Sequence, residues 1–210
     1  MINILIADDH AVVREGVKRI LSEMPDITVA GEAGNGQEAL EKIAKKAYDL
    51  ILLDIAMPGK DGLEILKEIK ALKPKLPVLV LSMFPEEQYA LRALKSGASG
   101  YLTKESIPDE LIKAVRKITQ GGKYISSSFS EKFILSMDSD MERPPHENLS
   151  DREYQVMRMI ASGRTLKEIA EALFLSVKTV STYRARILEK MGMKNNAELT
   201  HYAIKNNIVD

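Results

Sequence analysis

Five short apolar runs alternate with five amphipathic segments along the first 120 residues. Two of these runs, residues 2–7 and 50–53, are almost entirely aliphatic, as expected of parallel strands that are covered on both faces. This alternation is typical of a parallel sheet with helices packed on both sides. We therefore predict an α/β domain with strands near residues 2–7, 27–31, 49–53, 77–81 and 98–102.

Acidic residues follow two of the predicted strands directly. Asp8 and Asp9 come after the first run, and Asp54 comes after the third. Because ligands bind at the carboxyl ends of the strands in such folds, we expect the three carboxylates to lie together at one edge of the sheet. Clustered negative charges repel one another, so a bound divalent cation is the simplest explanation for them. Oxygen-only ligation, completed by a backbone carbonyl near Ala56, points to Mg²⁺.

Asp54 is the candidate nucleophile, because a carboxylate in line with a phosphoryl donor can form an acyl phosphate when a cation screens the incoming charge. Ser82 and Lys104 follow the fourth and fifth predicted strands, where a hydroxyl and an ammonium could bond phosphoryl oxygens. Taken singly, each is more often a helix cap, a turn residue or a solvated charge. Together, suitable residues at the ends of four strands favour a phosphoryl site. His10 is expected to face solvent.

This set of residues resembles the receiver domain of two-component response regulators. The resemblance covers residues 1 to about 120 and implies a doubly wound, flavodoxin-like sheet of five parallel strands in the order 2-1-3-4-5. The residues and motifs that carry it are Asp8-Asp9, Asp54 in LILLDIAMPGKDG, Ser82, and Lys104 in GYLTK.

The resemblance also implies a chemistry and a switch. A sensor histidine kinase would phosphorylate Asp54, with Mg²⁺ held by Asp8, Asp9 and Asp54. Ser82 would then move to the phosphoryl group while the aromatic ring of Tyr101 turns inward. Phosphorylation is expected to shift the protein toward a homodimer that engages two half-sites on duplex DNA.

The sequence changes character between residues 121 and 147. Gly121-Gly122, three consecutive serines and Pro144-Pro145 stand there without sustained periodicity, which indicates a linker, with one short helix at about 129–137. A capping box then opens the first of four short helices, the pattern of an all-α helix-turn-helix domain. The predicted domains are a receiver, a linker and a DNA-binding domain, at residues 1–120, 121–147 and 148–210.

The helix expected from Ser176 to Met191 has an apolar stripe and a basic face. The basic face is short-chained at Thr182 and Ala185, so it could approach a major groove closely, and the basic side chains around it could meet phosphates. Taken alone, such a helix is most often an ordinary surface helix. The apolar stripe consists of Val177, Val180, Ile187, Leu188 and Met191, and the basic side chains are Lys178, Arg186 and, on the flank, Lys190.

The wider stretch LSDREYQVMRMIASGRTLKEIAEALFLSVKTVSTYRARILEKMGM resembles the LuxR-type helix-turn-helix over about residues 149–205, and the whole chain resembles a NarL/FixJ-type response regulator. This resemblance makes the basic helix the recognition helix. Arg184 lies on the packing stripe, where its stem could pack while its head reaches a phosphate. The implied DNA contacts are Lys178, Thr179, Ser181, Thr182 and Arg186, and Arg184 and Lys190 complete the predicted set.

The composition excludes several classes of protein. With 45% hydrophobic and 29% charged residues, the chain has the make-up of a folded globular protein, and 210 residues suit two domains. The lack of cysteine excludes disulfides, thiolate metal sites and a cysteine nucleophile. The start lacks a basic leader and no apolar run approaches membrane-spanning length, so we expect a cytoplasmic protein without a membrane partner.

Two other functions share part of this pattern. A magnesium-dependent phosphatase or phosphotransferase could use Asp54 in the same way, but it needs a substrate pocket and a general acid that the sequence does not show. We therefore expect no enzyme beyond a receiver that catalyses its own phosphorylation and dephosphorylation. A receiver whose helical tail binds protein or RNA is the second alternative, and salt-dependent binding to duplex DNA would distinguish it.

Overall fold

The computed structural model describes residues 1–57, 60, 62–127, 129–130 and 144–209. These residues fall into two compact units, Met1–Ser139 and Asp140–Asp210. Within the described part of the chain, no helix has the length and apolarity that crossing a membrane requires. Most of the helix expected at 129–137 lies outside the described residues.

The first unit is built on a five-stranded sheet in which every neighbouring pair is parallel. Its order is β2-β1-β3-β4-β5, which confirms the order that the resemblance implied. Each strand lies within two residues of its predicted start, because an apolar run bounded by polar residues fixes a buried strand closely. The strands are β1 (Ile2–Ala7), β2 (Ile27–Ala33), β3 (Leu50–Asp54), β4 (Val78–Ser82) and β5 (Gly100–Thr103).

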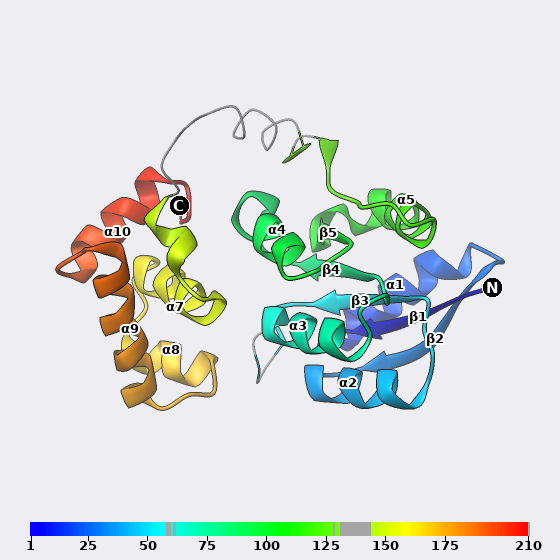
Figure 1. The fold of residues 1–210 in the computed structure, drawn as a ribbon, viewed down its shortest axis with the longest axis horizontal. Coiled ribbons are helices and arrows are strands. Elements are labelled where there is room, and N and C mark those ends of the chain that lie inside the picture. Colours follow the sequence, from blue (N-terminus) through cyan, green and yellow to red (C-terminus); the bar gives the residue numbers. More distant parts are fainter. Residues whose placement is uncertain (58–59, 61, 128, 131–143, 210) are drawn as a thin grey trace. The chain divides into compact units, whose positions relative to one another are not determined.

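Helices cover both faces of this sheet (Figure 1). Helices α1 and α5 contact each other on one face, whereas α3 contacts both α2 and α4 on the other. Four of them connect successive parallel strands, which need such a crossover, and α5 follows the last strand. Their bounds are α1 (Ala11–Ser22), α2 (Gly36–Lys45), α3 (Gly62–Leu72), α4 (Glu86–Lys95) and α5 (Ile107–Thr119).

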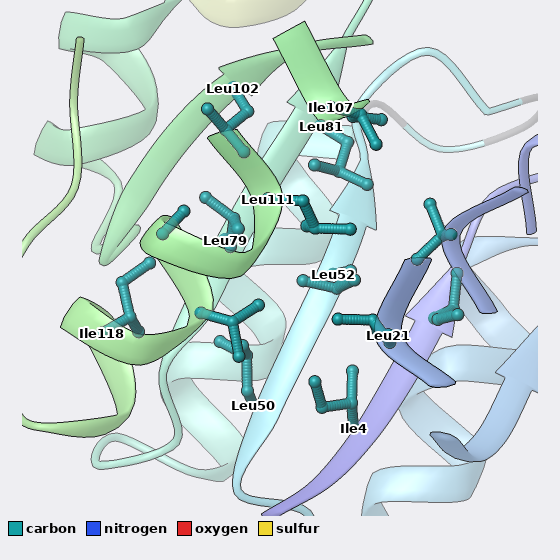
Figure 2. Close-up of a cluster of buried hydrophobic side chains, with 14 of the residues drawn as sticks. Ile4, Leu21, Leu50, Leu52, Leu79, Leu81, Leu102, Ile107, Leu111 and Ile118 are labelled. Atoms are coloured by element: carbon teal, nitrogen blue, oxygen red, sulfur yellow. The ribbon is translucent and has the colours of Figure 1, made fainter. Parts of the chain in front are cut away.

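The core beneath α1 and α5 is almost entirely aliphatic (Figure 2). Leu52 and Leu79 from the sheet are fully buried against Leu21 of α1 and Leu111 of α5. Each such side chain contributes about 1.5–3 kcal/mol by leaving water. This packing holds the carboxyl ends of β1, β3 and β4 in a fixed arrangement, and the candidate site lies at those ends.

The start of the predicted linker is bonded to the sheet. Tyr124 bridges to β5: its N–H donates to the carbonyl of Ser99 at 2.9 Å, and its carbonyl accepts from the N–H of Tyr101 at 3.0 Å. Ser126 then bonds the carboxylate of Glu86, through its hydroxyl and, at 3.2 Å, through its N–H. Segment 124–126 therefore continues the structure of the first unit beyond residue 120.

The second unit contains a 3₁₀ turn followed by four α-helices in the described residues. Side-chain caps define where these helices begin: Ser150 with Glu153, and Thr165 with Glu168, form complete capping boxes. At the end of α9, Gly192 adopts the left-handed conformation (φ 65°) that suits glycine. The elements are η2 (Pro145–Asn148), α7 (Asp151–Ala161), α8 (Leu166–Ala172), α9 (Val177–Met191) and α10 (Asn196–Lys205).

Candidate functional site

Asp8, Asp9 and Asp54 come together at the carboxyl edge of the sheet. Asp54 is the last residue of β3, and Asp8 and Asp9 follow β1. Each offers an oxygen to a cluster whose ligand atoms, together with a ring nitrogen of His10, all lie within 4.8 Å of one another. Asp8 and Asp54 are fully buried. The strand ends therefore hold three carboxylates close together although their negative charges repel one another.

Lys104 supplies the nearest positive charge. It follows β5 directly, in a 3₁₀ turn (Lys104–Ser106), and its ammonium lies 2.7 Å from Asp54 Oδ2 and 2.7 Å from Asp8 Oδ2. Only the contact with Asp54 has hydrogen-bond geometry, so the contact with Asp8 is an ion pair alone. The Lys104 side chain is 7% exposed, so the ammonium is shielded from water together with the two carboxylates.

Burial and charge act in opposite directions on these groups. Burial raises the pKa of the Asp54 carboxyl, and the ammonium of Lys104 and the N–H of Ala56 offset only part of that rise. Burial also disfavours the Lys104 ammonium, but its hydrogen bond to Asp54 and its ion pair with Asp8 outweigh that effect and raise the pKa of Lys104. The lysine is therefore held as a cation beside the candidate nucleophile.

Backbone groups fix two of the carboxylates. The N–H of Ala56 donates to Asp54 Oδ1 at 2.8 Å, and the N–H of His10 donates to Asp8 Oδ1 at 2.8 Å. In the described part of the chain, Asp8 Oδ2 and Asp9 Oδ1 are buried and accept no hydrogen bond. These oxygens, one beside the Lys104 ammonium and one beside His10 Nδ1, are hard donors that suit Mg²⁺, so the residues fit such an ion.

His10 lies at the surface, but one of its ring nitrogens faces the acidic cluster. Its side chain is 62% exposed, as the sequence predicts, yet Nδ1 lies 2.9 Å from Asp9 Oδ1. Sequence reasoning placed only the ring on the surface and missed the nitrogen that faces the acidic cluster. The only available signal was its position directly after the acidic pair.

Ser82 and Tyr101 converge on the backbone of Phe84. The hydroxyl of Ser82, at the end of β4, accepts from the N–H of Phe84 at 3.0 Å. The hydroxyl of Tyr101 donates to the carbonyl of Phe84 at 2.8 Å, and Tyr101 is fully buried. The inward position that the resemblance implied for the phosphorylated state is therefore the one present in this structure.

In the second unit, α9 packs through four of the five residues of the predicted stripe. Val180, Ile187, Leu188 and Met191 are buried. Val177 is 48% exposed, so its prediction as a packing residue is wrong. Val177 is the first residue of α9, directly after the N-cap Ser176. Its angle on a helical wheel does not show where the helices that pack against α9 end.

The exposed face of α9 contains a shallow hollow of about 330 Å³. Lys178, Thr182 and Arg186, which the resemblance assigns to DNA contact, all line it and are exposed. Ser181 is exposed as well. Sequence reasoning did not assign Tyr183 to this face. The complete lining is Lys178, Thr179, Thr182, Tyr183 and Arg186.

Two basic residues of α9 make bonds inside the unit. Arg184 Nε donates to Asn196 Oδ1 at 2.6 Å, and Lys190 Nζ donates to Glu153 Oε2 at 2.6 Å. Arg184 is half-buried as a whole, and its Nε is bonded to α10. The structure thus separates these two residues from the hollow.

Comparison with known proteins covers both units. Residues 4–116 match the response regulator receiver domain, and residues 147–203 match the bacterial regulatory proteins of the luxR family. Response regulator UvrY of Escherichia coli K12 is 37% identical over 209 residues, covering 99% of this chain and 96% of that protein. Oxygen regulatory protein NreC of Staphylococcus epidermidis ATCC 12228 is 39% identical over 215 residues, covering 99% of each.

A solved structure is similar over nearly the same length. It is RcsB from Salmonella enterica serovar Typhimurium, bound to promoter rprA in the presence of the phosphomimetic BeF₃⁻. Its TM-score is 0.68 at 28% identity, covering 96% of this chain and 98% of that one.

Proposed function

Because the chain belongs to the two-component response regulators that join a receiver domain to a LuxR-type DNA-binding domain, we propose that Asp54 is its phosphoacceptor. The protein is a phosphorylation-switched regulator of transcription. The observation that carries the proposal is the position of Asp54, buried at the end of β3 with the Lys104 ammonium 2.7 Å away.

In the proposed reaction, a carboxylate oxygen of Asp54 attacks the phosphorus of a phosphohistidine on the sensor kinase. A new O–P bond forms and the P–N bond breaks, with its electron pair staying on the imidazole nitrogen, which takes up a proton. Lys104 is already placed to balance the added negative charge. The products are an acyl phosphate on the regulator and a free histidine on the kinase.

Mg²⁺ is the cofactor we propose, held by Asp8, Asp9, Asp54 and the backbone carbonyl of Ala56. Asp8 Oδ2 and Asp9 Oδ1, the buried oxygens that accept no hydrogen bond, support this choice. When bound, the ion would screen the charge of the phosphoryl group as it approaches the acidic cluster.

The proposed switch uses the loop that starts at Ser82. Once Asp54 is phosphorylated, the Ser82 hydroxyl bonds a phosphoryl oxygen and gives up its bond to the N–H of Phe84. The buried Tyr101 hydroxyl holds the carbonyl of the same residue. The phosphoryl group therefore stabilises one conformation of this loop over the others, and the population of the protein shifts toward that conformation.

The proposed output is homodimerisation and binding of α9 in the major groove of duplex DNA. The exposed hollow, with two cations around hydroxyl and aromatic groups, supports this assignment. DNA and sensor kinase are thus the proposed partners, and the cytoplasm, where bacterial DNA lies, the proposed location. The proposed DNA contacts are Lys178, Thr179, Ser181, Thr182 and Arg186.

We also propose the predicted division into a receiver at residues 1–120, a linker at 121–147 and a DNA-binding domain at 148–210, with the start of the linker, residues 124–126, bonded to the receiver. The receiver would catalyse only its own phosphorylation and dephosphorylation. Multiple turnovers against common phosphoesters would contradict that restriction, whereas slow, self-limited labelling supports it.

Substitution of the phosphoacceptor tests the proposal. Asp54→Asn should abolish hydroxylamine-labile labelling by acetyl phosphate in Mg²⁺, because an amide is a far weaker nucleophile than a carboxylate. Asp109→Asn, an exposed aspartate in the first turn of α5, is the matched control and should be labelled like the wild type. Undiminished labelling of the Asp54→Asn protein would show that the phosphoacceptor lies elsewhere.

A further inference from the structure

We infer that Lys190 and Glu153 form a positioning pair that sets the orientation of the recognition helix, and that Lys190 does not contact DNA phosphates. This inference rests on the proposed binding of α9 to DNA. It assigns Lys178 and Arg186 to DNA contact and Lys190 to positioning, although a helical wheel places Lys190 beside the face that carries Lys178 and Arg186.

Glu153 is the starting point, because it is the one buried glutamate in the described part of the chain, at 3% exposure. It occupies the third position of α7, where Oε2 accepts the N–H of Ser150 at 2.8 Å and completes the capping box. A carboxylate this buried needs a cation partner, since an unpaired buried charge is strongly unfavourable.

Lys190 supplies that cation. Its ammonium donates to Glu153 Oε2 at 2.6 Å, while the side chain as a whole remains 41% exposed. If the ammonium turned toward a DNA phosphate instead, the Glu153 carboxylate would lose its ion-pair partner. The internal bond is therefore the stable location for this ammonium, even though its stem is accessible to solvent.

The pair joins two helix ends. Lys190 lies in the last turn of α9, where a positive charge also interacts favourably with the helix dipole, and Glu153 lies in the first turn of α7. Arg184 makes a second connection from the middle of α9 to Asn196, the first residue of α10. α9 is thus tied to its neighbours at two polar points, so the hollow on its exposed side is presented in one orientation.

Phosphate contacts and internal anchors have different signatures in salt. Each phosphate that a protein neutralises adds about 0.9 to the slope of log affinity against log salt, so losing one contact reduces the slope by about 1. An anchor that never touches DNA can weaken binding but leaves this slope unchanged. The slope therefore separates the two roles even where both substitutions reduce affinity.

The test uses the full-length phosphorylated protein and a duplex recovered by selection from a random pool. Lys178→Ala and Arg186→Ala should each reduce the salt slope by about 1. Lys190→Gln should weaken binding with the wild-type slope. Adding Glu153→Gln should restore the lost affinity, because the uncharged amide pair can bond without an unpaired carboxylate. Lys205→Ala, an exposed lysine of α10, is the control.

The possible failures are distinct. If Lys190→Gln reduces the slope by about 1 and Glu153→Gln does not restore affinity, Lys190 contacts phosphate and the positioning role is overturned, while the DNA-binding proposal stands. If Lys178→Ala and Arg186→Ala leave both affinity and slope unchanged, the assignment of α9 as the reading helix fails, and the positioning role fails with it.

Discussion

The ammonium of Lys104 lies 2.7 Å from a carboxylate oxygen of Asp8 and 2.7 Å from one of Asp54, so a single cation links the ends of β1, β3 and β5. β1 and β3 pair directly in the sheet and pack on a rigid aliphatic core, so the two carboxylates cannot move apart. The acidic edge is therefore held together by electrostatic neutralisation as well as by packing.

Removing this cation should destabilise the receiver. Lys104→Ala leaves two buried carboxylates without their cation, and we expect a loss of about 2–4 kcal/mol in the free energy of unfolding, measured by urea in EDTA. Added Mg²⁺ should recover part of the loss, since an ion that binds the folded state stabilises it. In the matched variant Lys60→Ala, which removes an exposed ion pair with Glu68, the loss should stay below about 1 kcal/mol. Equal losses in the two variants would contradict the account.

The acidic pair should control the affinity for Mg²⁺. Asp9→Asn removes the charge of a carboxylate with a buried oxygen that accepts no hydrogen bond, so we expect at least about tenfold weaker binding by isothermal titration calorimetry. Glu15→Gln, an exposed substitution on α1, is the control and should bind Mg²⁺ like the wild type. Wild-type affinity in the Asp9→Asn protein would remove Asp9 from the proposed ligand set.

The hydroxyl of Tyr101 should matter for both stability and switching. Tyr101→Phe removes its hydrogen bond to the carbonyl of Phe84 and should cost about 1 kcal/mol in unfolding free energy. The loop would then be held less firmly, so a smaller fraction of the phosphorylated protein should dimerise, as measured by analytical ultracentrifugation. A variant that loses stability but dimerises like the wild type would exclude the hydroxyl from the switch.

Stability of the second unit should depend on pH through Glu153. Burial opposes ionisation of this carboxyl, but hydrogen bonds from Lys190 and Ser150 outweigh burial and lower its pKa below the usual 4.5. Its stabilisation is therefore fully present above about pH 4.5 and is lost as the pH falls through the lowered pKa of the folded state.

Glu153→Gln exposes this dependence. The wild type should be more stable than the variant at pH 7, and the difference should shrink as the pH falls below 4.5, followed in urea through the methyl NMR signals of Ile187 and Leu188. Glu171→Gln, an exposed substitution on α8, should show no such change. A stability difference between the wild type and Glu153→Gln that stays constant down to pH 3 would mean that ionisation of the Glu153 carboxyl does not stabilise the protein.

The strands and their order followed closely from the sequence and its resemblance to a known family. An apolar run such as residues 50–53 has few alternatives to a buried strand, and a polar residue that follows the run lies at the carboxyl end of that strand. That is why Asp54 could be placed next to Asp8 without coordinates. Strand order itself came from the resemblance, because alternation alone is compatible with several doubly wound sheets.

Other features depend on contacts that a linear pattern does not contain. A helical wheel gives Lys190 an angle on α9 but cannot show that Glu153 of another helix lies opposite it. The exposure of Val177 has the same origin, since it depends on where neighbouring helices end. Tyr124 was assigned to a linker because glycines precede it, yet a single residue can bridge to a sheet edge without forming a strand of its own.

The bridge from Tyr124 to β5 determines where the chain leaves the receiver. Ser126 is tied to Glu86, two residues beyond Phe84, while Tyr124 is tied to the backbone of Tyr101. We therefore expect a movement of that loop to shift segment 124–126 as well, because these bonds join the two. The response of the receiver to phosphorylation would then reach the residue at which the chain leaves the sheet.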